Sequence, residues 1–275
     1  MMRRLRLLVC LISSLVLTLN ACGPSTAAPV AILPSPTGEP LPVTPVESAF
    51  APGNLTAAPL DDIIEAHTVT FTTPDGAMIT GELYGSGTTA VVFSVMGNCR
   101  PGWRELAQQT AAQGLMAFTY AWRDCGPGGP VNERDLIQNF VNDARGAIDF
   151  VRQQGAEKVI LAGASLGGLA SVKLAIEANA SGLIIFASPV EIARWDFTVE
   201  AEDLNIDIPK LFMTAEEDTV VPLASSQALY DLAADPKEWQ TYPGTAHGTD
   251  LFEKDFGEEA ARRILEFILS VHTSS

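Results

Sequence analysis

Residues 159–178 read VILAGASLGGLASVKLAIEA: an apolar run, a serine between glycines, and then a stretch with helical spacing. The apolar run predicts a buried strand, and the residues after Ser165 predict a helix. At such a strand-to-helix turn, the Gly-x-Ser-x-Gly pattern lets the serine adopt a strained backbone, because the glycines avoid a collision between strand and helix. Ser165 is then either an exposed nucleophile or the N-cap of the helix, and the pattern alone leaves both interpretations open.

Short apolar runs and helical stretches alternate along the rest of residues 61–275. Five runs, each flanked by glycine, proline or charge, predict strands buried on both faces: AVVFSVMG, LMAFTYAW, KVILAGAS, GLIIFASP and PKLFMTAEED. A hairpin signal at Asp75-Gly76 precedes them. The alternation predicts an α/β fold, with a mostly parallel central sheet and helices on both of its faces.

A nucleophilic serine on such a sheet requires a histidine base later in the chain. The sequence has three histidines. His67 precedes the serine, and His272 lies close to the last residue. His247 lies in the glycine-bracketed loop GTAHG, after the short run EWQTY. His247 is therefore the predicted base, with an exposed loop histidine as the alternative interpretation.

An acid that orients the histidine is expected after a strand that lies between Ser165 and His247 in the sequence. The segment IPKLFMTAEEDTVVP supplies an apolar run followed by Glu216, Glu217 and Asp218. Asp218 is the predicted acid, and Glu217 is the alternative. A carboxylate that is not used in this way is expected to be a solvated surface charge.

From about residue 66 to 271, the chain resembles the α/β-hydrolase superfamily of serine hydrolases, through GASLGG, AEEDTVVP and GTAHG in the family's order of serine, acid and histidine. The TPDGAMITGELYG hairpin, with VMGN and YAWRDCGPGG after the next two strands, is similar to simple bacterial esterases and dienelactone-hydrolase-like members. The resemblance implies the α/β-hydrolase fold and a catalytic triad of Ser165, Asp218 and His247. It also implies an oxyanion hole formed by the backbone N–H groups of Leu166 and Asn98. No cofactor and no metal are expected.

The segment in which relatives with a lid insert it is short in this chain. Residues 189–207 provide 19 residues, too few for a full cap domain. An open site for small or medium acyl esters is therefore expected, with hydrolysis of amides or thioesters as the alternative. Five side chains are candidates for the pocket wall, with ordinary packing or surface exposure as the alternative for each: Met96, Arg100, Trp103, Trp122 and Trp195.

The first 60 residues have a different composition. Three arginines precede an apolar run of thirteen residues, which is typical of a signal peptide and too short to span a membrane. The following Leu-Asn-Ala-Cys resembles the lipobox of bacterial lipoproteins, in which Cys22 would carry the lipid; secretion without a lipid is the alternative. We expect a lipoprotein signal peptide at 1–21, an extended tether rich in Pro, Thr, Ser and Ala at 22–60, and a catalytic domain at 61–275. The lipid would anchor the exported protein to the extracytoplasmic side of a membrane.

Charge and cysteine content add two expectations. The net charge of −16 argues against nucleic acid as a partner, because phosphate binding relies on Lys and Arg. Cys99 and Cys125 follow two strands that are neighbours in an α/β-hydrolase fold. A disulfide between them is therefore predicted.

Two functions of other classes remain as alternatives. One is a surface binding protein that keeps the fold without turning over a substrate. The retention of Ser165, Asp218 and His247 argues against it. The other is a thiol enzyme that uses Cys99, and the lack of a Cys-x-x-Cys partner argues against that.

Overall fold

The computed structural model describes residues 64–94, 102–125 and 135–274. The predicted signal peptide, Cys22 and the tether lie outside the described residues, as do Met96, Asn98, Cys99 and Arg100. Within the described part, eight strands form one sheet in the order β1-β2-β4-β3-β5-β6-β9-β10. Their bounds are β1 (His67–Thr72), β2 (Met78–Tyr84), β3 (Thr89–Ser94), β4 (Met116–Tyr120), β5 (Lys158–Ala164), β6 (Gly182–Phe186), β9 (Lys210–Ala215) and β10 (Lys237–Tyr242).

The sheet is mostly parallel. Each adjacent pair from β4 to β10 runs in parallel, whereas β1 pairs with β2, and β2 with β4, in antiparallel register. The turn between β1 and β2 contains Gly76 with a φ of 87°, as the Asp-Gly signal predicts. The predicted α/β class is confirmed. Because the strands are parallel, their carboxyl ends, and the loops that follow them, meet at one edge of the sheet.

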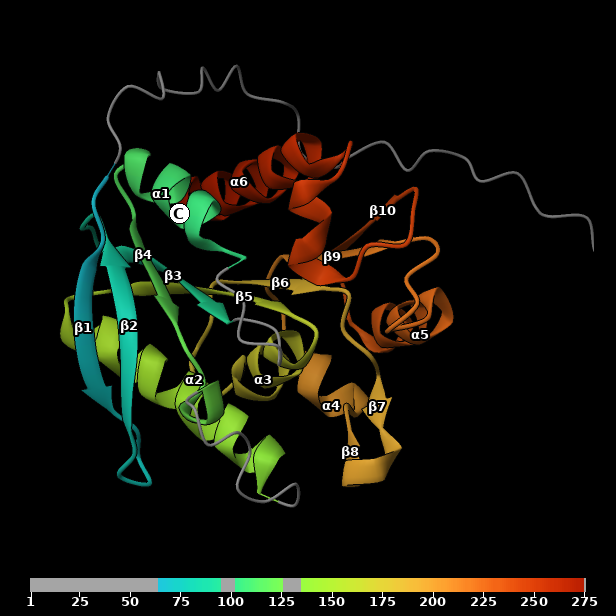
Figure 1. Cartoon of the computed structure of the whole chain (residues 1–275), viewed down its shortest axis with the longest axis horizontal. Helices are drawn as coiled ribbons and strands as arrows, with labels where there is room; N and C mark the ends of the chain where they lie inside the picture. Colours follow the sequence, from blue (N-terminus) through green and yellow to red (C-terminus); the bar gives the residue numbers. More distant parts are fainter. Residues whose placement is uncertain (1–63, 95–101, 126–134, 275) are drawn as a thin grey trace, which may run out of the picture. The chain divides into compact units, whose positions relative to one another are not determined.

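Helices cover both faces of the sheet (Figure 1). In this view α1 (Arg104–Ala112) and α6 (Gly257–Thr273) lie on one face, and α2 (Leu136–Gln153) and α3 (Leu166–Leu174) lie on the other. Every residue of β3, β4, β6 and β9 is buried, as expected for strands that are covered on both faces. None of the helices in residues 64–94, 102–125 and 135–274 is both long and apolar enough to cross a membrane.

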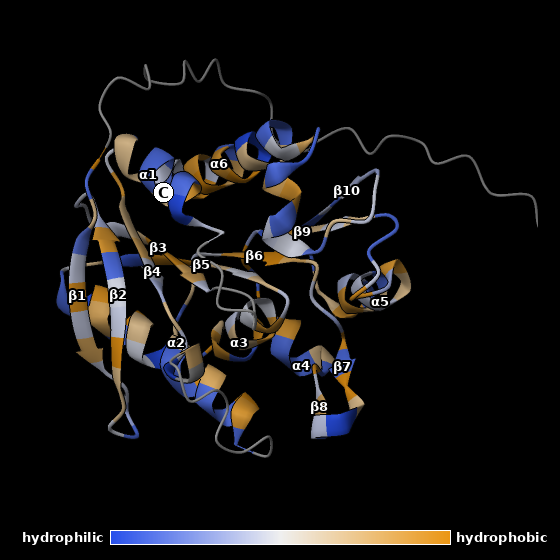
Figure 2. Cartoon of the chain, in the orientation of Figure 1, coloured by the Kyte–Doolittle hydropathy of each residue, from blue (hydrophilic) through white to orange (hydrophobic). Residues whose placement is uncertain are grey.

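The helices α2 and α6 are amphipathic, and their apolar stripes face the sheet. In α2 the stripe includes Phe140, Ala144, Ala147 and Val151, whose spacing of three to four residues puts them on one side of the helix. Figure 2 shows the corresponding alternation of apolar and polar residues along α2 and α6, next to central strands that are largely apolar. At the β10 end of the sheet, Arg263 of α6 pairs with Glu238 of the strand.

The segment between β6 and β9 is a small insertion. It consists of β7 (Glu191–Ile192) paired with β8 (Phe197–Thr198), followed by the single-turn helix α4 (Ala201–Leu204). Lys173 of α3 holds this insertion: its ammonium pairs with the carboxylate of Asp203 and lies 5.4 Å from the ring centroid of Phe197. The insertion is therefore fixed to α3 and is much smaller than a cap domain.

An ion cluster ties the β1–β2 turn to the end of β4 and to α2. Two guanidinium nitrogens of Arg123 donate to the two carboxylate oxygens of Asp75, at 2.7 and 2.9 Å. The Nε of Arg123 donates to Asp143 Oδ1 at 2.7 Å, and its backbone N–H donates to Asp143 Oδ2 at 2.8 Å. The hydrogen bond from Arg123 is the main reason why the pKa of Asp75 lies below its usual value, whereas burial raises the pKa of Asp143. Arg123 is thus the cation that makes a fully buried carboxylate tolerable.

We predict that Arg123→Ala lowers the free energy of unfolding by about 3–5 kcal/mol, because it leaves the buried charge of Asp143 without its cation. Urea denaturation of the full chain at neutral pH measures the change. Arg262→Ala is the control, since Arg262 is largely exposed and pairs with Glu266 on the same helix; its effect should stay below about 0.5 kcal/mol. Equal losses for the two variants would contradict the assignment.

Candidate active site

Ser165 occupies the turn between β5 and α3. Its backbone is in a strained region, with φ 53° and ψ −120°, and its N–H donates to the carbonyl of Phe186 at 2.8 Å. Ser165 is the residue that precedes α3, yet its side chain makes no capping hydrogen bond to that helix. The N-cap interpretation of the Gly-x-Ser-x-Gly pattern therefore fails on its main requirement.

The glycines around Ser165 allow two close backbone approaches. A Cβ atom on Gly163 would lie 2.2 Å from the carbonyl oxygen of Gly167, which is far inside van der Waals contact. A Cβ atom on Gly168 would lie 1.9 Å from the Oγ of Ser188, in the loop after β6. Glycine is therefore required at 163 because strand and helix meet there, and at 168 because α3 packs against the neighbouring loop.

Asp218 and His247 are joined by a hydrogen bond. His247 Nδ1 lies 2.8 Å from Asp218 Oδ2, and the other carboxylate oxygen accepts the backbone N–H groups of Val220 and Val221 at 2.8 and 3.0 Å. The Asp218 side chain is fully buried and that of His247 is 13% exposed. Glu217, the alternative acid, is exposed, and the described contacts place its backbone N–H on the carbonyl of Gly244. Of the two candidate acids, Asp218 is the one that contacts the histidine.

The three residues lie at the same edge of the sheet. Ser165 follows β5, Asp218 follows β9 and His247 follows β10, and all three strands end at the edge where the parallel carboxyl ends meet. A ring contact links two of these loops. Phe252, in the turn of 3₁₀ helix after His247 (Gly248–Glu253), packs on Phe186 with ring centroids 5.7 Å apart. Phe186 is the residue whose carbonyl holds the backbone of Ser165.

The three tryptophans predicted as candidates for the pocket wall differ in their surroundings. Trp103 is completely buried, and Trp122 is 2% exposed and packs edge-on against Tyr120 and Phe140. Both therefore have the packing of core residues. Trp195 lies in the small insertion, with the guanidinium of Arg194 4.1 Å from its ring centroid. Its indole nitrogen is buried without a hydrogen-bond partner among the described residues.

The sequence also predicts a disulfide at this edge of the sheet. Cys125, which ends the 3₁₀ turn after β4, is disulfide-bonded. Its predicted partner, Cys99, lies outside the described residues, so the pairing stays a prediction. In the part of the chain that the structure describes, no three His, Cys, Asp or Glu side chains are grouped to hold a metal ion.

Sequence reasoning missed the side chains that support the site. Phe186, Ser188 and Phe252 read as ordinary apolar or loop residues, because nothing in their spacing relates them to Ser165 or His247. Arg123 is visible in the motif YAWRDCGPGG, but its partner Asp75 lies 48 residues earlier in the chain. The Asp-Gly turn predicts the conformation of that hairpin and gives no sign of the ion cluster.

Comparison with known proteins identifies the fold. No family model matches the chain. The uncharacterized protein YfhR of Salmonella typhi is 26% identical over 269 residues, covering 83% of this chain and 89% of that protein. The solved structure of the Pyrococcus furiosus esterase Pf2001 superposes with a TM-score of 0.61 at 15% identity, over 75% of this chain and 93% of that chain. The Xanthomonas campestris protein XC6422, described as an α/β serine hydrolase without lid, gives a TM-score of 0.56 at 14% identity, over 75% and 93%.

At these identities the likeness defines the fold. The chain has the α/β-hydrolase fold, as its sequence motifs predict.

We predict that Gly168→Ala lowers the free energy of unfolding by about 1–3 kcal/mol, because the new methyl group collides with Ser188 Oγ. Ser188→Ala removes the colliding atom. The double variant should therefore be more stable than the sum of the two single losses implies. Urea denaturation of the four proteins measures this coupling. Simple additivity would show that the contact between α3 and the β6 loop is not as tight as the geometry indicates.

Proposed function

We propose that the chain is a serine hydrolase that cleaves carboxylic ester bonds of small or medium acyl substrates. One observation carries the proposal: the 2.8 Å hydrogen bond between His247 Nδ1 and buried Asp218, at the sheet edge where Ser165 has a strained backbone and a hydroxyl that does not cap its helix. Acyl transfer requires a nucleophile, a base and an orienting acid, and we assign these roles to Ser165, His247 and Asp218.

The proposed mechanism follows from the tautomer that Asp218 favours. Because Asp218 Oδ2 accepts a hydrogen bond from Nδ1–H of His247, the neutral imidazole keeps its lone pair on Nε2. That nitrogen takes the hydroxyl proton of Ser165 as the oxygen attacks the ester carbonyl, and then delivers the proton to the departing alkoxide. Water, activated by the same nitrogen, attacks the acyl-enzyme, which releases the acid and regenerates the serine.

Backbone N–H groups would stabilise the charge on the carbonyl oxygen. Leu166 is the first residue of α3, so its N–H lies at the positive end of a helix dipole and directly after the nucleophile. The second donor is the predicted N–H of Asn98. Two N–H groups are the usual number for such a site, and each is worth roughly 10²- to 10³-fold in kcat.

The small insertion supports a preference for compact, soluble esters. Residues 191–204 form a hairpin whose two strands have two residues each, followed by one helical turn. These elements cover less of a substrate than a cap domain would. The esterase and the lidless serine hydrolase among the structural neighbours are consistent with this substrate class. Met96, Arg100 and Trp195 remain proposed pocket residues. Amides and thioesters are the alternative substrates, and a silent binding protein is the alternative of another class.

We also propose that the protein is exported and held at the extracytoplasmic side of a membrane by a lipid on Cys22. The support is the arginine-rich start, the apolar run and the lipobox-like Leu-Asn-Ala-Cys. The disulfide at Cys125 agrees with an oxidising compartment outside the cytoplasm.

Ser165→Ala should abolish labelling by a fluorophosphonate probe and lower kcat for p-nitrophenyl esters on the order of 10⁴- to 10⁶-fold. The reason is that the variant removes the oxygen that attacks the ester carbonyl and forms the acyl-enzyme. Ser270→Ala is the matched control and should label and hydrolyse like the wild type, since Ser270 lies in α6 and its hydroxyl donates to the carbonyl of Phe267 in the same helix. Wild-type protein that neither labels nor hydrolyses any ester of the series would contradict the proposed function.

Asp218→Asn should lower kcat on the order of 10⁴-fold, because an amide at this position stabilises the wrong tautomer of His247. Glu217→Gln makes the same chemical change one residue earlier, at an exposed side chain, and should keep kcat close to that of the wild type. The comparison uses p-nitrophenyl acetate at saturating concentration. A larger loss for Glu217→Gln than for Asp218→Asn would mean that the orienting acid is wrongly assigned.

A further inference from the structure

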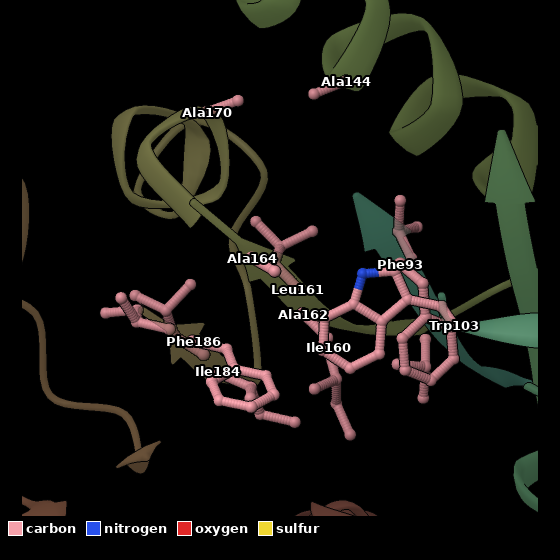
Figure 3. Packing of buried hydrophobic residues seen from close by; sticks show 14 of the residues in the cluster. Phe93, Trp103, Ala144, Ile160, Leu161, Ala162, Ala164, Ala170, Ile184 and Phe186 are labelled. Atoms are coloured by element: carbon pink, nitrogen blue, oxygen red, sulfur yellow. The ribbon is translucent and has the colours of Figure 1, made fainter. Parts of the chain in front are cut away.

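Among the described residues, Trp103 is the largest fully buried side chain. Its ring contacts come from three separate segments near the edge of the sheet where the carboxyl ends of the parallel strands meet. Its ring lies 5.2 Å from that of Phe93 in β3, 6.2 Å from that of Phe186 at the end of β6, and 5.6 Å from that of Phe252 after His247. Figure 3 shows Trp103 beside Phe93, next to the buried side chains of β5 and β6. Trp103 therefore contacts β3 near its end, Phe186, whose carbonyl accepts the N–H of Ser165, and the 3₁₀ turn that follows His247. We call this turn, residues 248–253, the histidine loop.

The indole nitrogen of Trp103 makes a hydrogen bond as well. Its indole Nε1–H donates to the carbonyl of Ser94 at 3.0 Å. This hydrogen bond joins the last residue of β3 to the residue that precedes α1. The Ser94 side chain is held in turn by Tyr120, whose hydroxyl lies 2.8 Å from Ser94 Oγ.

The residue before Trp103 makes a second contact with the histidine loop. A Cβ atom on Gly102 would lie 2.1 Å from Thr249 Oγ1, so the backbone at 102 is packed directly against the second residue after His247. Thr249 is itself 4% exposed. The pairs Gly102–Thr249 and Trp103–Phe252 form one continuous contact between the start of α1 and the turn that follows His247.

We infer that Trp103 is a positioning residue for the proposed hydrolysis: it sets the histidine loop and the end of β3 in fixed relation to the turn that carries Ser165. The inference rests on the proposed function and adds the side chain that aligns its parts. Proton transfer and oxyanion binding both depend on this alignment, because a misplacement of about 1 Å can cost roughly 10²-fold in rate. Trp103 is completely buried and does not touch the substrate, so it acts only through the loops that it contacts.

The test compares two substitutions of Trp103 in the full chain with the same substitutions of Trp239. Trp103→Phe keeps an aromatic ring and loses the N–H, and we expect kcat per active site to fall about fivefold, the worth of one hydrogen bond. Trp103→Leu also loses the ring contacts, and kcat should fall on the order of 10²-fold with KM within about twofold of wild type. Trp239, in β10, packs on Tyr230 with ring centroids 5.4 Å apart, and its variants should retain the wild-type kcat.

Active sites are counted by stoichiometric labelling with a fluorophosphonate, so that loss of folded protein does not count as loss of rate. Phe252→Leu, alone and with Trp103→Leu, tests the ring contact between Trp103 and the turn after His247: the combined loss in kcat should be smaller than the product of the single losses. Wild-type kcat per active site in Trp103→Phe and Trp103→Leu would overturn the inference while leaving the proposed function intact, and so would strictly multiplicative losses with Phe252→Leu. A wild type that hydrolyses no ester and does not label would overturn the proposed function, and this inference with it.

Discussion

The left-handed backbone of Ser165 is the constraint on which the rest of the site depends. A non-glycine residue with this geometry costs on the order of 1–3 kcal/mol, and it persists only where its surroundings leave it no alternative. Here the surroundings are the carbonyl of Phe186, which accepts the N–H of Ser165, and the contact between Gly163 and the backbone of Gly167, which leaves no room for a side chain. The strain at one residue is offset by contacts with β6 and α3, so the turn cannot relax without displacing both elements.

The buried carboxylates of Asp143 and Asp218 are stabilised in different ways: a cation pairs with the first, and neutral N–H groups donate to the second. Asp143 faces the guanidinium of Arg123, so its charge is neutralised and it serves the fold. Asp218 has one oxygen on two backbone N–H groups and the other on the ring of His247. Because the N–H donors are neutral, the negative charge of Asp218 remains available to the imidazole. A full cation at that position would compete with His247 for the same charge.

Sequence patterns predicted the class of the fold, the strand-to-helix turn and the pair of residues that the structure joins as Asp218 and His247. They succeeded because alternating apolar runs, paired glycines and a glycine-bracketed histidine report local constraints. They could not decide between nucleophile and N-cap for Ser165, since that choice depends on dihedral angles and on where the hydroxyl bonds. They also could not distinguish Trp103 in the core from Trp103 in a pocket wall, because burial of a tryptophan depends on segments more than a hundred residues away, such as the one that contains Phe252.

The edge strand β10 is polar, with two charged residues at its start, where the inner strands are apolar. Its sequence is KEWQTY, and Glu238 is engaged by Arg263 of α6. A strand in this position presents backbone N–H and C=O groups toward solvent on one side and can recruit another chain. Charged side chains on such a strand must be desolvated before a second strand adds, and the pairing of Glu238 with α6 fixes one of them in place. The sheet is therefore protected at this end against edge-to-edge association between copies of the protein, which matters most wherever many copies are crowded together.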